Sequence, residues 1–142
     1  MQKSYSEDKV NILIACDANK SRPWFRDRIP SMEKSASELE WNIEIVDFYS
    51  LLGNHKLKPS NIEDREQFIQ SANILDINKY FKEFIFKKNP NVLLLGTVDN
   101  YKDFLLARTI SEIRENGILV SGILGDDEFN HLQNRFFIGW FD

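Results

Sequence analysis

Short, uninterrupted apolar runs alternate along this chain with longer segments in which apolar residues recur every three or four positions. Five runs predict β-strands, over residues 10–16, 42–49, 91–97, 118–124 and 136–141. The runs at 10–16, 91–97 and 118–124 are apolar at nearly every position, which is typical of strands buried on both faces of a parallel sheet. The run at 42–49 alternates apolar with polar residues and indicates a strand nearer the edge of the sheet.

The segment after the first run predicts an amphipathic helix. Its apolar residues recur at intervals of three and four, at Phe25, Ile29, Met32, Ala36 and Leu39. Such spacing places them on one face of a helix. Pro30 interrupts the stretch, so we expect either a kink there or a helix whose regular part begins at Pro30.

Two further helices are predicted before the third and fourth strands. One follows a capping box at residues 60–63 (SNIE), and it may be broken near Asn73. Its apolar stripe consists of Ile74, Ile77, Phe81, Phe84 and Ile85. The other covers residues 102–116, and Gly117 is placed to end it in the left-handed conformation. Its inward residues are expected to be Leu106, Ile110 and Ile113.

Alternation of strands and helices predicts a parallel sheet joined by right-handed crossovers. The apolar strands 10–16 and 91–97 should be central, with 42–49 flanking 10–16. The strand order is then 2-1-3-4-5 in a three-layer, Rossmann or flavodoxin-like α/β domain that spans residues 1–142. We expect five strand residues to be nearly inaccessible to solvent: Ile12, Ile14, Leu93, Leu95 and Ile123.

Composition narrows the classes of partner and compartment. With 18 basic and 22 acidic residues, the net charge of −4 argues against a nucleic-acid or anionic-membrane partner. The single cysteine, Cys16, excludes an intrachain disulfide and a multi-cysteine zinc site. The polar first nine residues do not resemble a signal peptide, and no apolar run approaches the roughly 20 residues that span a bilayer. We therefore expect a cytoplasmic domain without a membrane span.

Ligands of doubly wound sheets bind beyond the carboxyl ends of the strands. Four acids follow strands in this sequence: Asp17, Asp99, Asp126 and Asp127. Carboxylates gathered at one edge can hold Mg²⁺ or act as general bases, although a single Asp is more often a plain loop or cap residue. Asp126 is the strongest candidate because it comes directly after a strand. We predict no bound metal and no cofactor, since three loop acids without defined geometry do not specify a metal.

Residues 16–22 (CDANKSR) fit the spacing C-x5-R. The segment resembles the phosphate loop of low-molecular-weight protein tyrosine phosphatases, in which a thiolate attacks a phosphate held by loop amides and an arginine. Asn19 and Arg22 match that loop, whereas Ala18 replaces an expected glycine and Pro23 an expected hydroxyl residue. A buried cysteine that ends a strand is the commoner case, so we expect Cys16 to be structural.

A wider resemblance covers the distal half of the chain. Its residues are 89–95 (NPNVLLL), 113–118 (IRENGI), 122–127 (GILGDD) and 141–142 (FD). In this order they resemble the N-terminal half of CgeB-like bacterial glycosyltransferases. The resemblance implies a two-domain GT-B architecture, in which the N-terminal half receives the acceptor and the C-terminal half holds most of the nucleotide-sugar.

Our first hypothesis is therefore the acceptor-side domain of a glycosyltransferase that is inactive alone. Asp126 is the catalytic candidate, and the substrate-binding candidates are Asp17, Asn19, Arg22, Asp99 and Asp127. The acceptor would be a small molecule or glycan, and a C-terminal domain or partner chain would cover the apolar strand 136–141. The alternatives are a non-catalytic flavodoxin-like binding or signalling module and a cysteine phosphatase that uses Cys16 and Arg22.

Overall fold

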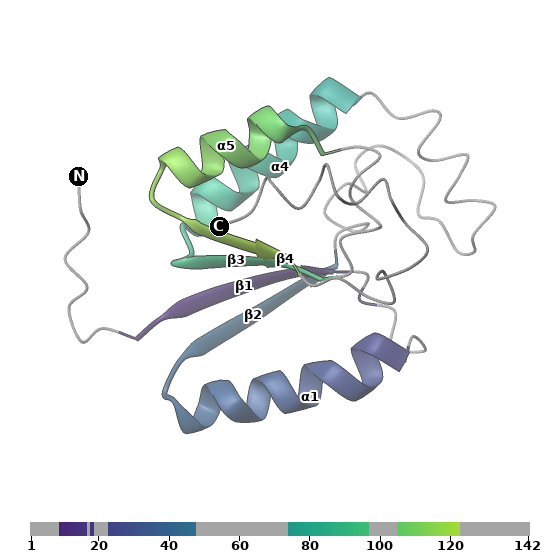
Figure 1. The fold of residues 1–142 in the computed structure, drawn as a ribbon, viewed down its shortest axis with the longest axis vertical. Coiled ribbons are helices and arrows are strands. Elements are labelled where there is room, and N and C mark those ends of the chain that lie inside the picture. Colours follow the sequence, from purple (N-terminus) through teal and green to yellow (C-terminus); the bar gives the residue numbers. More distant parts are fainter. Residues whose placement is uncertain (1–8, 17, 19–22, 48–73, 97–104, 123–142) are drawn as a thin grey trace.

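The computed structural model describes residues 9–16, 18, 23–47, 74–96 and 105–122. These residues form a parallel sheet with one helix against one face and two helices against the other (Figure 1). The strands are β1 (Asn11–Cys16), β2 (Asn42–Asp47), β3 (Val92–Leu95) and β4 (Leu119–Gly122). The helices are α1 (Pro23–Glu38), α4 (Ile74–Lys88) and α5 (Ala107–Glu115). Among the described helices, none combines the length and apolar character needed to cross a bilayer.

The sheet has the order β2-β1-β3-β4, and all three strand pairs are parallel. Ile14 lies between Ile45 of β2 and Leu94 of β3, so β1 occupies the centre. The parallel α/β class and the first four positions of the predicted order are confirmed. The predicted fifth strand, 136–141, lies outside the described residues.

Asparagine side chains join the strands where they begin. The Asn91 side-chain oxygen accepts a hydrogen bond from the Asn11 backbone N–H at 2.8 Å, and the Asn42 amide donates to the Asn11 side chain at 2.9 Å. These contacts link the starts of β1, β2 and β3. They provide hydrogen-bond partners for polar groups at the edge where the hydrogen bonds between the strands end.

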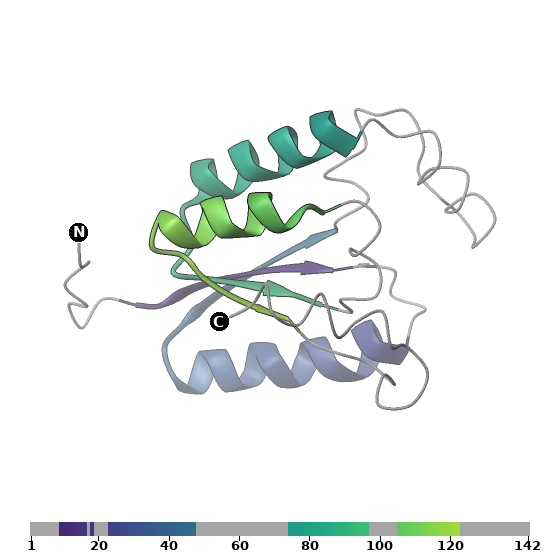
Figure 2. The same cartoon turned by 45° about the horizontal axis from the view of Figure 1, so that its top comes forward.

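The larger core lies between the sheet and the pair α4 and α5, which run side by side over one face (Figure 2). Strand residues two positions apart, such as Leu93 and Leu95, point to this face as the pleat requires. The helices meet them with residues spaced by three and four, which are fully buried: Ile77, Phe81, Ile85, Ile110 and Ile113. The predicted apolar stripe of α4 is confirmed at Ile77, Phe81 and Ile85, whereas Phe84 is only half-buried and the Ile74 side chain lies outside the described part of the structure.

Helix α5 begins at Ala107 rather than at Lys102, because Leu106 has extended backbone dihedral angles and serves as the N-cap residue. Leu106 itself cannot cap the helix with its side chain. Asn78 of α4 does so instead: its side-chain oxygen accepts hydrogen bonds from the Leu106 backbone N–H at 2.9 Å and the Thr109 hydroxyl at 2.7 Å. The prediction that Leu106 faces inward is wrong, since it is 38% exposed, and Leu105 is buried in its place.

Each described helix is followed by a residue in the left-handed conformation, which reverses the chain into the next strand. These residues are Glu40 after α1, Asn89 after α4 and Gly117 after α5, with φ of 58°, 47° and 80°. The Gly117 N–H donates to the Arg114 carbonyl at 2.8 Å, which satisfies one of the orphan acceptors at the end of α5. The predicted role of Gly117 is confirmed.

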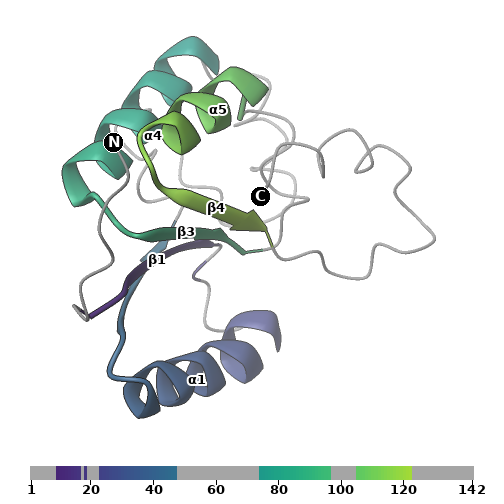
Figure 3. The ribbon, with the colours of Figure 1, turned by 60° about the vertical axis from the view of Figure 1, so that its left-hand side comes forward.

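The face beneath α1, on the opposite side of the sheet in Figure 3, has a smaller core. Its buried cluster consists of Ile14, Cys16 and Ile29. Ile12 is only half-buried, so its predicted inaccessibility is wrong, whereas Ile14, Leu93 and Leu95 are buried as predicted. Ile123 lies outside the described residues. Helix α1 starts at Pro23 and continues through Pro30, which removes the N–H partner of the carbonyl four residues earlier.

Replacing Asn78 by Ala should lower the free energy of unfolding by about 1–3 kcal/mol, because the Leu106 N–H and the Thr109 hydroxyl would lose a buried acceptor. Urea denaturation followed by circular dichroism measures the change. Asn116→Ala is the matched control: its exposed amide donates one hydrogen bond to the Glu112 carbonyl, and its loss should cost under about 1 kcal/mol. Equal effects of the two substitutions would contradict the capping role of Asn78.

The free energy of unfolding should also fall in acid because of Glu112, an α5 residue that pairs with Lys82 of α4. The Lys82 ammonium, and next the Arg108 guanidinium, hydrogen-bond its carboxylate and hold the pKa of Glu112 below its ordinary value. A carboxyl group whose pKa is lower in the folded state stabilises the fold above its unfolded pKa, and that contribution disappears as the pH falls through the folded pKa.

We therefore expect Glu112→Gln to reduce the difference in unfolding free energy between pH 7 and acid conditions, as measured by urea denaturation across that range. Glu115→Gln serves as the control, because among the described residues the exposed Glu115 carboxylate accepts a hydrogen bond from the Ser111 hydroxyl, at 3.5 Å, and forms no ion pair. An unchanged pH dependence in Glu112→Gln would show that the pairing with Lys82 and Arg108 contributes nothing measurable.

Candidate functional site

The carboxyl ends of the strands meet at one edge of the sheet, and the described residues there include Cys16, Asp47, Gly96 and Gly122. The helices that follow β1 and β3 lie on opposite faces: α1 on one, α5 on the other (Figure 3). The connections therefore diverge between β1 and β3. In doubly wound sheets this divergence is the point where ligands bind.

Two hydrogen bonds fix the backbone at this edge. The Ala18 N–H donates to Oδ1 of Asp47 at 3.2 Å, and the Gly96 N–H donates to the Ala15 carbonyl at 2.9 Å. The first bond ties the segment after β1 to the last residue of β2, and the second continues the β1–β3 ladder by one residue. Both hold the chain in place where the predicted site begins.

Asp47 is a residue that the sequence reasoning missed. It is half-buried at the end of β2 and lies opposite Cys16 in the parallel register. The available signal was an acid that ends a strand expected to flank the first one. Its bond to the Ala18 N–H gives it a positioning role for the segment between β1 and α1.

All six residues predicted for the site lie outside the described residues: Asp17, Asn19, Arg22, Asp99, Asp126 and Asp127. Their gathering at one edge stays a prediction. That prediction requires β1, β3 and β4 to end at the same edge, because the acids follow these strands in the sequence. The described strands meet this requirement. Within the described part of the chain, no group of three or more His, Cys, Asp or Glu side chains is arranged to hold a metal ion.

Cys16 is the described member of the C-x5-R segment, and its side chain is 0% exposed. It belongs to the apolar cluster with Ile14 and Ile29 beneath α1. A nucleophilic thiolate requires access and a positive environment. Its burial among apolar side chains instead suits a structural thiol, as the sequence analysis expected.

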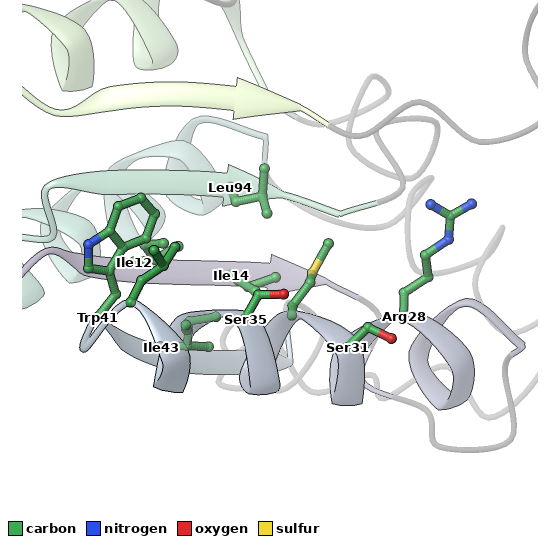
Figure 4. Close-up of a pocket in the computed structure, with 11 residues that line it drawn as sticks. Ile12, Ile14, Arg28, Ser31, Ser35, Trp41, Ile43 and Leu94 are labelled. Atoms are coloured by element: carbon green, nitrogen blue, oxygen red, sulfur yellow. The ribbon is translucent and has the colours of Figure 1, made fainter.

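A cavity of about 370 Å³ lies between α1 and the sheet, away from the carboxyl edge itself (Figure 4). Side chains of three strands form its floor: Ile12, Ile14, Ile43 and Leu94. Residues of α1 and the turn after it form the other wall: Arg28, Ser31, Met32, Ser35, Ala36, Leu39 and Trp41. Its volume falls in the range of small-molecule sites, and its floor is apolar.

Sequence reasoning did not predict this cavity. The helical spacing correctly placed Ile29 and Ala36 beneath α1, where both are buried. The signal that was available is Ser31 and Ser35, which are also directed to the cavity but are too small to fill the space between helix and sheet.

Comparison of the whole chain with protein-family models, with curated proteins and with solved structures finds no significant match.

Burial should make Cys16 unreactive in the native protein. We expect Ellman's reagent to modify it at least about a hundredfold more slowly than an engineered cysteine in Ser37→Cys, which is exposed on α1, because access to Cys16 requires local opening. In urea, both thiols should react at once. Native-state reactivity equal to that of the Ser37→Cys thiol would contradict a structural role. So would hydrolysis of p-nitrophenyl phosphate that disappears in Cys16→Ser.

Proposed function

We propose that this chain is the acceptor-side, Rossmann-like domain of a GT-B-type glycosyltransferase. The observation that carries the proposal is the parallel β2-β1-β3-β4 sheet, with α1 and α5 on opposite faces and a single edge where all four strands end. That edge is the binding position of doubly wound sheets. The sequence after β4 contains Asp126 and Asp127, the paired aspartates that are the best motif of the resemblance to CgeB-like enzymes.

In this proposal Asp126 acts as the general base that accepts the proton of the attacking acceptor hydroxyl. Asp17, Asp99 and Asp127 accept hydrogen bonds from other hydroxyl groups of the acceptor, while Asn19 and Arg22 donate to its oxygens. A sugar or another polyol satisfies such a set, because each of its hydroxyl groups both donates and accepts.

The same residues explain why the domain would be inactive alone. Transfer from a nucleotide-sugar needs acceptor and donor held together, and such positioning can supply roughly 7 to 11 kcal/mol of the barrier. The leaving diphosphate also needs preorganised cations or donors. Among the six proposed site residues, four are acids and only Arg22 is a cation, so a diphosphate would meet repulsion at this edge.

A non-catalytic binding module is the second candidate. The cavity beneath α1 favours it, because that cavity lies against a face of the sheet and its lining contains no carboxylate. A cysteine phosphatase is disfavoured by the complete burial of Cys16 among apolar side chains.

Two binding experiments test the proposal. Calorimetric titration of the 142-residue chain with uridine and guanosine diphosphate sugars should show no micromolar binding and no hydrolysis, because the donor contacts lie in the other domain. On a glycan array, the chain should retain a defined set of sugars. Asp126→Asn should weaken that retention at least about tenfold, the lower end of what one carboxylate partner contributes to a buried polar contact.

Glu115→Gln is the matched control, because Glu115 ends α5 at the opposite edge of the sheet, just before β4 begins. It should leave glycan retention unchanged. Micromolar binding or turnover of a nucleotide-sugar by this chain alone would identify a complete small enzyme. Loss of glycan retention in both variants, or in neither, would contradict a role for Asp126 at the acceptor.

A further inference from the structure

The cavity beneath α1 combines an apolar floor with a helix wall that does not close it. Ile12, Ile14, Ile43 and Leu94 rise from three neighbouring strands toward α1, as Figure 4 shows. Opposite them, α1 presents Ser31 and Ser35. A buried helix–sheet interface normally fills such positions with large apolar side chains, since interiors are close-packed. Here the serine side chains are small and exposed, and they line an open cavity in whose floor Ile12 is half-buried and Ile14 is buried.

The two ends of the cavity differ in chemistry. Trp41 and Leu39 lie at the end where β1 begins, and Arg28 lies at the other end, toward the carboxyl edge (Figure 4). Arg28 is exposed, and the described residues three and four positions from it toward the helix C-terminus, Ser31 and Met32, carry no charge.

The neighbouring arginine of the same helix differs from Arg28. Nε of Arg26 lies 2.8 Å from Oδ1 of Asp27, and the partly exposed pair lies outside the cavity. Among the described residues, no ion pair involves Arg28. Arg28 therefore gives the cavity one cationic end.

The volume also indicates the shape of the occupant. About 370 Å³ lies at the small end of the range of small-molecule sites. A single extended hydrocarbon chain is narrow enough to lie along the floor.

We propose that this cavity binds a free single-chain amphiphile with a carboxylate head group, such as a medium- or long-chain fatty acid. The chain contacts Ile12, Ile14, Ile43 and Leu94, and the carboxylate pairs with Arg28 at the open end. The proposal goes beyond the acceptor site at the carboxyl edge and does not depend on it.

Calorimetric titration of the full chain with dodecanoate, below its micellar concentration, tests the proposal. We expect saturable binding of one molecule per chain. Ser35→Leu should weaken it at least about tenfold, because the leucine side chain occupies the space that the hydrocarbon needs. Ser37→Leu introduces the same side chain at a position of the same helix that does not line the cavity, and it should leave binding unchanged.

A second pair of variants tests the head group without altering the core. Arg28→Gln should weaken dodecanoate binding by about threefold, as expected for an exposed ion pair, and should leave dodecanol binding unchanged. Arg26→Gln should change neither.

Three outcomes would overturn the proposal: no saturable binding of dodecanoate, equal effects of Ser35→Leu and Ser37→Leu, or equal effects of the two arginine variants. A dimer in sedimentation velocity that Ser35→Leu dissociates would show that a second copy occupies the cavity, and would overturn it too. Glycan retention in Ser35→Leu should match that of the unsubstituted chain. Failure of the fatty-acid proposal is therefore distinguishable from failure of the glycosyltransferase proposal.

Discussion

The pairing of β1 with a parallel strand on each side is the constraint on which the rest of this structure depends. Residues 12–15 of β1 lie between β2 and β3 and pair with both strands in parallel register. Two parallel neighbours require crossover connections, and right-handed crossovers on the two sides of β1 direct the helices to opposite faces. The opposition of α1 to α4 and α5, and the gathering of all four carboxyl ends at one edge, follow from this central position.

The two faces of the sheet are filled unequally, and that difference separates stability from binding. On one face, α4 and α5 interlock with β1, β3 and β4 through large, fully buried side chains, and Asn78 joins the two helices by a buried hydrogen-bond network. On the other face, the buried cluster among the described residues consists of Ile14, Cys16 and Ile29. The larger described core is therefore on the first face, and the cavity beneath α1 is on the second.

Sequence periodicity predicted what depends on local spacing and missed what depends on distant partners. The strand order and the stripe of α4 follow from runs and periods, so both were predictable. The start of α5 was not, because Asn78, 28 residues earlier, caps it. Ile12 was misassigned because it lines the open cavity beneath α1, which the apolar run of its own strand does not indicate. The six predicted site residues belong to connections between elements, where periodicity gives no position in space.

The direction of α1 places one end of the cavity, marked by Arg28, toward the carboxyl edge of the sheet. Because α1 follows β1 and returns antiparallel to it, its first turns lie near the carboxyl edge and its last turn near the start of β2 (Figure 1). Arg28 in the first half of α1 therefore lies closer to that edge than Trp41 does. The Asp47 contact with Ala18 restrains the connection between β1 and α1 on the same side. The cationic end of the cavity therefore lies toward the edge of the sheet at which the acceptor site is proposed.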